Sequence, residues 1–100
     1  MNEKDKEALN LLGLARKGHM LIAGRTAVAR NIKRGKLLIL ASDLSKKTRE
    51  KWLRDARFYG IDVIEKWDME TIGRAIGKKP VGVLLITDRG MAEKLKQLSI

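Results

Sequence analysis

A chain of 100 residues can enclose a single hydrophobic core, so we expect one domain spanning residues 1–100. The chain has no cysteine, which excludes disulfides and thiolate chemistry and favours a reducing compartment. Twenty-two Lys and Arg against 12 Asp and Glu give a net charge of +10, and a small protein with that charge attracts polyanions. Nucleic acid is therefore the leading class of partner.

The basic residues are concentrated in one part of the sequence. Residues 8–42 contain seven Lys and Arg and no Asp or Glu. A run of charge is usually a solvated face, but the complete absence of acids here favours contact with RNA or DNA. A membrane-surface helix would need large apolar side chains, whereas the basic helix expected over residues 25–34 offers only Val28, Ile32 and alanines. Because there is also no apolar run long enough for a signal peptide or a membrane span, we expect a soluble, cytoplasmic protein without a membrane partner.

The predicted elements of the first half alternate between helix and strand. Apolar residues at helical spacing predict a helix over residues 3–17, ended by Gly18. The segment "MLIAG" predicts a short buried strand. A helix is then expected over residues 25–34, with Val28 and Ile32 facing inward and Gly35 ending it. The continuous apolar run "LLILA" predicts a second buried strand.

The second half continues this alternation. The same signals predict a helix over residues 46–59 capped by Ser45, a half-buried strand "IDVIE", a short helix over residues 69–76, a strand "VGVLLIT", and a last helix from Asp88 to Leu98. Apolar strands separated by helices need cover on both faces of their sheet. We therefore expect an α/β fold, a three-layer α/β/α sandwich around a mixed four-stranded sheet, whose strand order the pattern leaves open.

Residues that could carry catalysis are scarce. His19 is the only histidine, and neither GxGxxG nor GxxxxGK[ST] occurs. The carboxylates Asp43, Asp62 and Asp88 fit capping and turn roles better than an acidic metal cluster. With Trp52 on the inner face of its helix, the remaining aromatic residues are too few for a base-stacking sheet. We expect no catalytic residue, no metal and no cofactor.

Several segments together carry a family resemblance. The run "GRTAVARNIKRGKLLILASD", preceded by "LLGLARKGHMLIAG" and followed by "FYGIDVI", "IGRAIGKK" and "LLITD", resembles the kink-turn-binding ribosomal protein superfamily. This superfamily includes ribosomal proteins seven-Ae and thirty-e, and its small bacterial members are the most similar to this chain. The resemblance covers nearly all of the sequence. It implies an α/β/α sandwich that binds kink-turn RNA, a sharply bent helix, and it implies no catalysis.

The resemblance also implies where RNA would bind. In the family, the helix after the first strand enters the bend with its N-terminus, where free N–H groups favour phosphate. The matching positions here are Gly24 and Arg25, followed by Thr26 and Ala27 where other members carry a polar pair that reads guanine edges. Because the Ala27 side chain cannot hydrogen-bond, we expect phosphate contacts to outweigh base reading. The family's basic residue one turn later matches Arg30, and its Arg-Gly pair at the helix end matches Arg34 and Gly35; we expect Lys33, on the same helix, to contact RNA as well.

A second implied element is the loop before the last strand, which in the family presents small apolar residues to a flipped-out nucleotide. It matches Gly77, Lys78, Lys79 and Val81 in this chain. Because two lysines replace part of the apolar tip, we expect the loop to contact phosphate more than to stack on a base. Phosphate contacts position a protein without reading sequence, so both departures favour recognition of RNA by its shape.

The resulting hypothesis is a monomeric, non-enzymatic, ribosomal-protein-like RNA-binding protein. Its partner would be ribosomal RNA or another RNA containing a kink-turn or a similar bend, in a ribonucleoprotein such as the ribosome. Two alternatives stay open: a protein-interaction scaffold, and a stand-alone form of the recognition domain of an RNA-modifying enzyme such as a ribose methyltransferase. Binding that is insensitive to salt would favour the scaffold, and methyl transfer would favour the enzyme.

Overall fold

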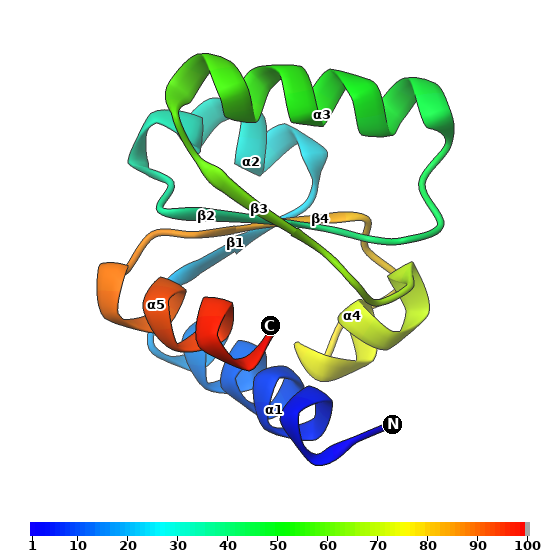
Figure 1. The fold of residues 1–100 in the computed structure, drawn as a ribbon, viewed down its shortest axis with the longest axis vertical. Helices are drawn as coiled ribbons and strands as arrows, with labels where there is room; N and C mark the ends of the chain where they lie inside the picture. Colours follow the sequence, from blue (N-terminus) through cyan, green and yellow to red (C-terminus); the bar gives the residue numbers. More distant parts are fainter. Residues whose placement is uncertain (100) are drawn as a thin grey trace.

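The computed structural model describes residues 1–99 and has helices on both faces of one four-stranded sheet (Figure 1). The elements in chain order are α1 (Glu3–Lys17), β1 (Leu21–Ala23), α2 (Arg25–Asn31), the 3₁₀ helix η1 (Ile32–Arg34), β2 (Leu37–Leu40), α3 (Lys46–Tyr59), β3 (Asp62–Glu65), α4 (Met69–Ala75), β4 (Val83–Ile86) and α5 (Arg89–Leu98). Helices α2 and α3 cover one face, and α1, α4 and α5 cover the other. The predicted three-layer sandwich is confirmed.

The strand order in the sheet is β1-β4-β2-β3. Strands β2 and β3 are parallel, while β4 is antiparallel to both β1 and β2, so the sheet is mixed as expected. The two central strands, β2 and β4, are buried at every residue. Strand β1 was expected to be buried but is only partly so, because it lies at the edge of the sheet with one paired neighbour.

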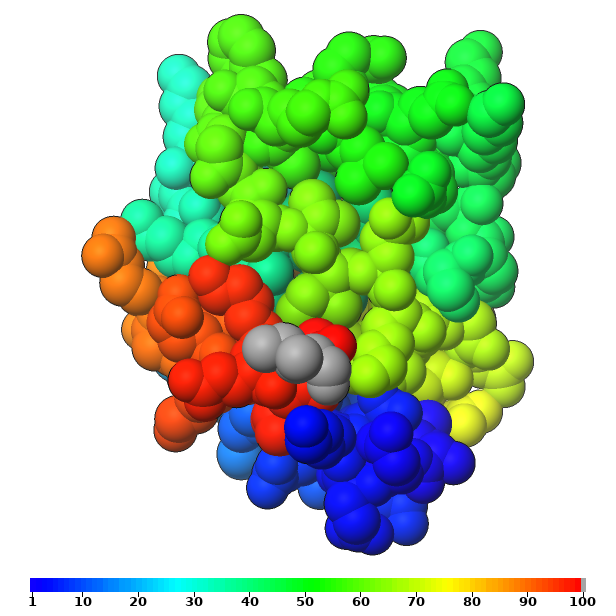
Figure 2. Space-filling model, viewed as in Figure 1, coloured from blue at the N-terminus to red at the C-terminus, as the bar shows by residue number. Residues whose placement is uncertain are grey.

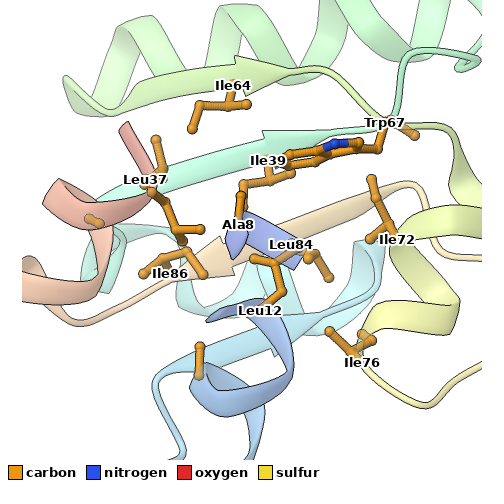
Figure 3. Close-up of a cluster of buried hydrophobic side chains, with 14 residues drawn as sticks. Ala8, Leu12, Leu37, Ile39, Ile64, Trp67, Ile72, Ile76, Leu84 and Ile86 are labelled. Atoms are coloured by element: carbon orange, nitrogen blue, oxygen red, sulfur yellow. The ribbon is translucent and has the colours of Figure 1, made fainter. Parts of the chain in front are cut away.

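The two central strands divide their side chains between two hydrophobic cores because successive strand residues point to opposite faces. Leu37, Ile39, Leu84 and Ile86 pack with α1, α4 and α5 (Figure 3). Their alternate neighbours, Leu38, Leu40, Val83 and Leu85, pack with α2 and α3 in the second core. Among the residues around the second core, Trp52 is buried as predicted. Each face of the sheet therefore has its own buried cluster, and both helical layers are held by apolar contacts.

Most helix boundaries agree with the predicted ones because their caps are present. The side chains of Ser45, Asp68 and Asp88 accept hydrogen bonds from the N–H groups of Thr48, Thr71 and Met91, at the starts of α3, α4 and α5. Each cap satisfies an N–H group that has no partner inside the helix.

The acidic side chains that follow or lie in strands have roles within the fold. The carboxylate of Asp43 accepts a hydrogen bond from the N–H of Met69. The expected capping or turn role of Asp62 is wrong, because it lies in β3 and pairs with Lys96 of α5 at 2.9 Å.

Between residues 1 and 99, no helix combines the length and apolar composition needed to cross a membrane.

The helix predicted over residues 25–34 is present, but it changes type over its last three residues. Its α-helical part ends at Asn31, and residues 32–34 form the tighter helix η1. Gly35 follows with an extended backbone, φ −72°, so it is not a left-handed stop. A Cβ at Gly35 would collide with the side chain of Leu85, and glycine is therefore needed for close packing onto β4. At the end of α1 the left-handed residue is His19, with φ 59°, and not Gly18.

Candidate functional site

The start of α2 is attached to the sheet through Gly24. The N–H of Gly24 donates to the carbonyl of Val83 in β4 (3.0 Å), and its own carbonyl accepts from the N–H of Val28 (2.9 Å). Gly24 has φ 93°, a conformation that favours glycine although a Cβ would meet no atom there. The first N–H groups of a helix have no acceptor inside the helix. Within residues 1–99 no side chain caps α2, so the N–H groups of its first turn have no acceptor from a capping side chain either.

The loop before β4 is held against α4 by backbone contacts. The N–H of Lys78 donates to the carbonyl of Gly73 (2.8 Å), and the N–H of Val81 donates to that of Met69 (3.1 Å). Gly77 has φ 70°, and the guanidinium of Arg16 donates to the carbonyl just before it. The loop therefore has a defined position. Its lysines, Lys78 and Lys79, are exposed, while Val81 packs partly against the core.

These two segments meet at one open groove of about 400 Å³, which we call the α2–loop groove. It is lined by Ala23, Gly24, Lys78, Lys79, Pro80 and Val81. Four of the sequence-predicted site residues are thus brought together. Gly77 is not among them, because it lines a separate groove between α1 and α4 together with Arg16 and His19.

Arg25 and Thr26 lie beside the α2–loop groove and line a further groove of about 650 Å³, between α2 and α3. The basic side chains on its α3 side are Lys47, Lys51 and Arg54, which lie outside the predicted site. The signal was present, because residues spaced by four and three positions lie on one face of a helix. The Lys51 ammonium already has two partners in the fold: it pairs with Asp55 at 3.0 Å and lies 3.7 Å from the ring centroid of Trp52.

The other predicted site residues of this segment lie further along α2 and η1. Arg30 is exposed, whereas Ala27 is partly buried and its carbonyl accepts a hydrogen bond from the Asn31 side chain (2.8 Å). The Asn31 side chain in turn accepts from Arg34 (3.2 Å). Lys33 is exposed and lines a different groove beyond the end of α2. The predicted residues therefore form a band along α2 that starts at the α2–loop groove.

The net positive charge of the chain belongs almost entirely to one layer. The segments 24–36 and 45–60, which contain α2, η1 and α3, carry eleven Lys and Arg and two acids, leaving eleven bases against ten acids elsewhere. This layer therefore holds nine of the ten net positive charges. Of its eleven bases, only Arg49 and Lys51 form ion pairs within residues 1–99. The predicted concentration of basic residues in residues 8–42 includes those of α2 but not those of α3.

The perturbed titratable groups lie outside this basic band. A hydrogen bond from the Lys66 ammonium lowers the pKa of Asp5, and the cap on α4 lowers the pKa of Asp68. Glu65 raises the pKa of Arg49, and Asp62 and Glu93 raise that of Lys96. These shifts accompany ion pairs and a helix cap. Over residues 1–99 no three His, Cys, Asp or Glu side chains gather where they could hold a metal ion.

The family model described as the ribosomal protein L7Ae/L30e/S12e/Gadd45 family matches residues 6–96. The chain belongs to this family. Two relatives carry the name RNA-binding protein YlxQ. The one from Bacillus subtilis (strain 168) is 33% identical over 90 residues, which are 88% of this chain and 90% of the relative. The one from Enterococcus faecium is 34% identical over 101 residues, covering 98% and 97% of the two chains.

Solved structures show the same fold. A protein described as having unknown function from Bacillus halodurans superposes with a TM-score of 0.86 at 34% identity, over 91% of this chain and 94% of that one. A Giardia lamblia 15.5kD RNA binding protein has a TM-score of 0.76 over 99% and 87% of the two chains. At 18% identity, that second likeness supports the fold alone.

Proposed function

We propose that this member of the L7Ae family is a non-enzymatic RNA-binding protein that recognises kink-turn RNA, or a similarly bent RNA, in the cytoplasm. The observation that carries the proposal is the separation of charge, with nine of ten net positive charges in the α2–α3 layer. Support also comes from the relatives, both of which are named as RNA-binding proteins. In this proposal the free protein is a monomer, and a ribonucleoprotein such as the ribosome is its setting.

The proposed mode of binding follows from the α2–loop groove. Bending an RNA helix brings the phosphates of two arms together, and their repulsion opposes the bend. The groove has Lys78 and Lys79 on one side and Gly24 on the other, and Arg25 follows Gly24 at the exposed start of α2, so positive charge is available to both arms. The bent RNA would then bind more tightly than the straight one, which shifts the RNA population toward the bend. Thr26, on the exposed first turn of α2, supplies a hydroxyl that can contact a base.

The test compares a kink-turn RNA with the same RNA after its sheared G·A pairs have been replaced. Fluorescence anisotropy with the purified protein, repeated over a range of salt concentrations, gives both affinity and salt dependence. We expect a preference for the intact kink-turn of about tenfold or more, which corresponds to about 1.4 kcal/mol. Equal affinity for both RNAs would refute recognition of the bend, and binding insensitive to salt would refute phosphate contact.

A pair of charge reversals locates the surface. Arg30→Glu reverses the charge of an exposed side chain of α2. It should weaken binding of the kink-turn markedly without changing the fold. Lys4→Glu is the matched control, because it makes the same change of charge on an exposed residue of α1 in the opposite layer (Figure 1). Equal losses in the two variants would indicate an effect of total charge and would remove α2 as the proposed surface.

A further inference from the structure

Two aromatic side chains lie side by side on the surface at the end of α3. Phe58 is 81% exposed and Tyr59 is 39% exposed, whereas both tryptophans are buried. Their rings meet edge to face with centroids 4.9 Å apart. Gly60 ends the helix immediately after them with φ 66°. Because Phe58 is exposed and belongs to neither core cluster, burial in the core does not account for a large apolar ring at this position.

A groove of about 400 Å³ adjoins Tyr59 and has basic walls. Lys33 and Lys36 reach it from the segment after α2, and Arg89 reaches it from the start of α5. All three are exposed, and within residues 1–99 none forms an ion pair. The acid in the groove, Glu93, is paired with Lys96 at 3.0 Å. Figure 2 shows the three segments at the left of the view, with the teal end of α2 and the green end of α3 above the orange start of α5.

We propose that Phe58 and Tyr59, together with Lys33, Lys36 and Arg89, form a second RNA contact, which holds unpaired nucleotides. Nucleobases stack on exposed aromatic rings, and cations next to the rings bind the phosphates that link those bases. Stacking tolerates any sequence because every base has a π face. This inference rests on the proposed function only in taking RNA as the partner, since it uses residues outside the α2–loop groove.

The position of the cluster suits single-stranded nucleotides that flank a bent motif. The α2–loop groove lies at the start of α2, and the aromatic cluster lies beyond the end of η1. Seven α-helical and three 3₁₀ residues separate the two ends, a distance of about 16 Å at the usual rises per residue. One RNA can therefore occupy both contacts, with its bent part at one end of α2 and an unpaired extension at the other.

The experiment measures affinity for a fluorescein-labelled single strand of about ten uridines and for a blunt-ended kink-turn RNA. The variants are Phe58→Ala and Tyr59→Ala, with Leu14→Ala as the control because it removes an exposed apolar side chain from α1. We expect each ring variant to bind the single strand about fivefold or more weakly, while blunt kink-turn binding and the control stay unchanged. Phe58→Ala should fold normally, because the ring is exposed and alanine favours helix.

The outcomes separate this inference from the proposed function. Loss of single-strand binding in the ring variants supports the second contact, even if the intact kink-turn shows no preference. Wild-type protein that does not bind the single strand overturns the inference, as do ring variants that bind it normally. Ultraviolet crosslinking supplies an independent readout: we expect uridine on tryptic peptide 58–66, and crosslinks confined to α2 peptides would overturn the inference.

Discussion

Gly73 controls where the loop with Lys78 and Lys79 sits relative to α4. It is buried, and a Cβ there would lie 2.7 Å from the carbonyl carbon of Lys79 and 2.9 Å from the Cα of Pro80. Non-bonded carbon atoms prefer about 3.5–4.0 Å, so in Gly73→Ala the loop backbone must move by about 1 Å. Overpacking of this kind costs about 1–3 kcal/mol, while alanine in a helix returns about 1 kcal/mol. We therefore expect Gly73→Ala to lose up to about 2 kcal/mol of unfolding free energy.

Urea unfolding of Gly73→Ala beside Gly90→Ala tests the sign of this effect. Gly90 is also helical, but its Cβ would lie 3.4 Å from a side-chain oxygen of Asp88, an ordinary contact, so the same change should gain up to about 1 kcal/mol. Amide NMR shifts over residues 77–81 report the loop, and kink-turn affinity should fall because the lysines move relative to Gly24. Equal gains in stability from both substitutions, with unchanged loop shifts, would refute the reasoning.

Three further outcomes are expected. The Lys66 ammonium, 2.9 Å from Asp5, lowers the pKa of that carboxyl from its usual 3.8, so its stabilising effect is present above that value and lost as pH falls. Between about pH 5 and pH 2, the melting temperature of Asp5→Asn should consequently fall by less than that of the wild type. Ser45→Ala removes the cap on α3 and should cost about 1 kcal/mol in urea unfolding, whereas Ser42→Ala, which removes no cap, should not. Lys79→Ala should reduce the logarithmic salt slope of kink-turn binding by about 1 and leave unfolding free energy unchanged.

The layers of the fold could be predicted because the relevant signals are local. Leu37 to Leu40 form an uninterrupted apolar run that only a doubly covered strand explains, and Ser45 and Asp88 can cap a helix without any distant partner. The partial exposure of β1 could not be predicted, because it depends on β4 pairing between β1 and β2. The change to η1 at Ile32 breaks a run of helical spacing that the sequence alone continues.

The candidate site was predictable along α2 and less so elsewhere. The spacing of Arg25 and Arg30 could be read from a single acid-free segment. The groove that joins Gly24 to Lys78 requires the hydrogen bond between Gly24 and Val83, which lies between residues far apart in the chain. The number of aromatic residues is too small for a stacking sheet, but that number does not reveal that Tyr59 lines the same groove as Lys33.

The charge separation has an energetic consequence for the free protein. Both helical layers have buried apolar clusters, so stability does not require that one layer hold nearly all the positive charge. Most ion pairs among residues 1–99 involve α1, α4, α5 or β3, and nine bases of the α2–α3 layer have no such partner. These bases repel one another, and a polyanion that binds them removes this repulsion. RNA should therefore raise the melting temperature of the protein through binding to the folded state, and screening salt should raise that of the free protein while it weakens the complex.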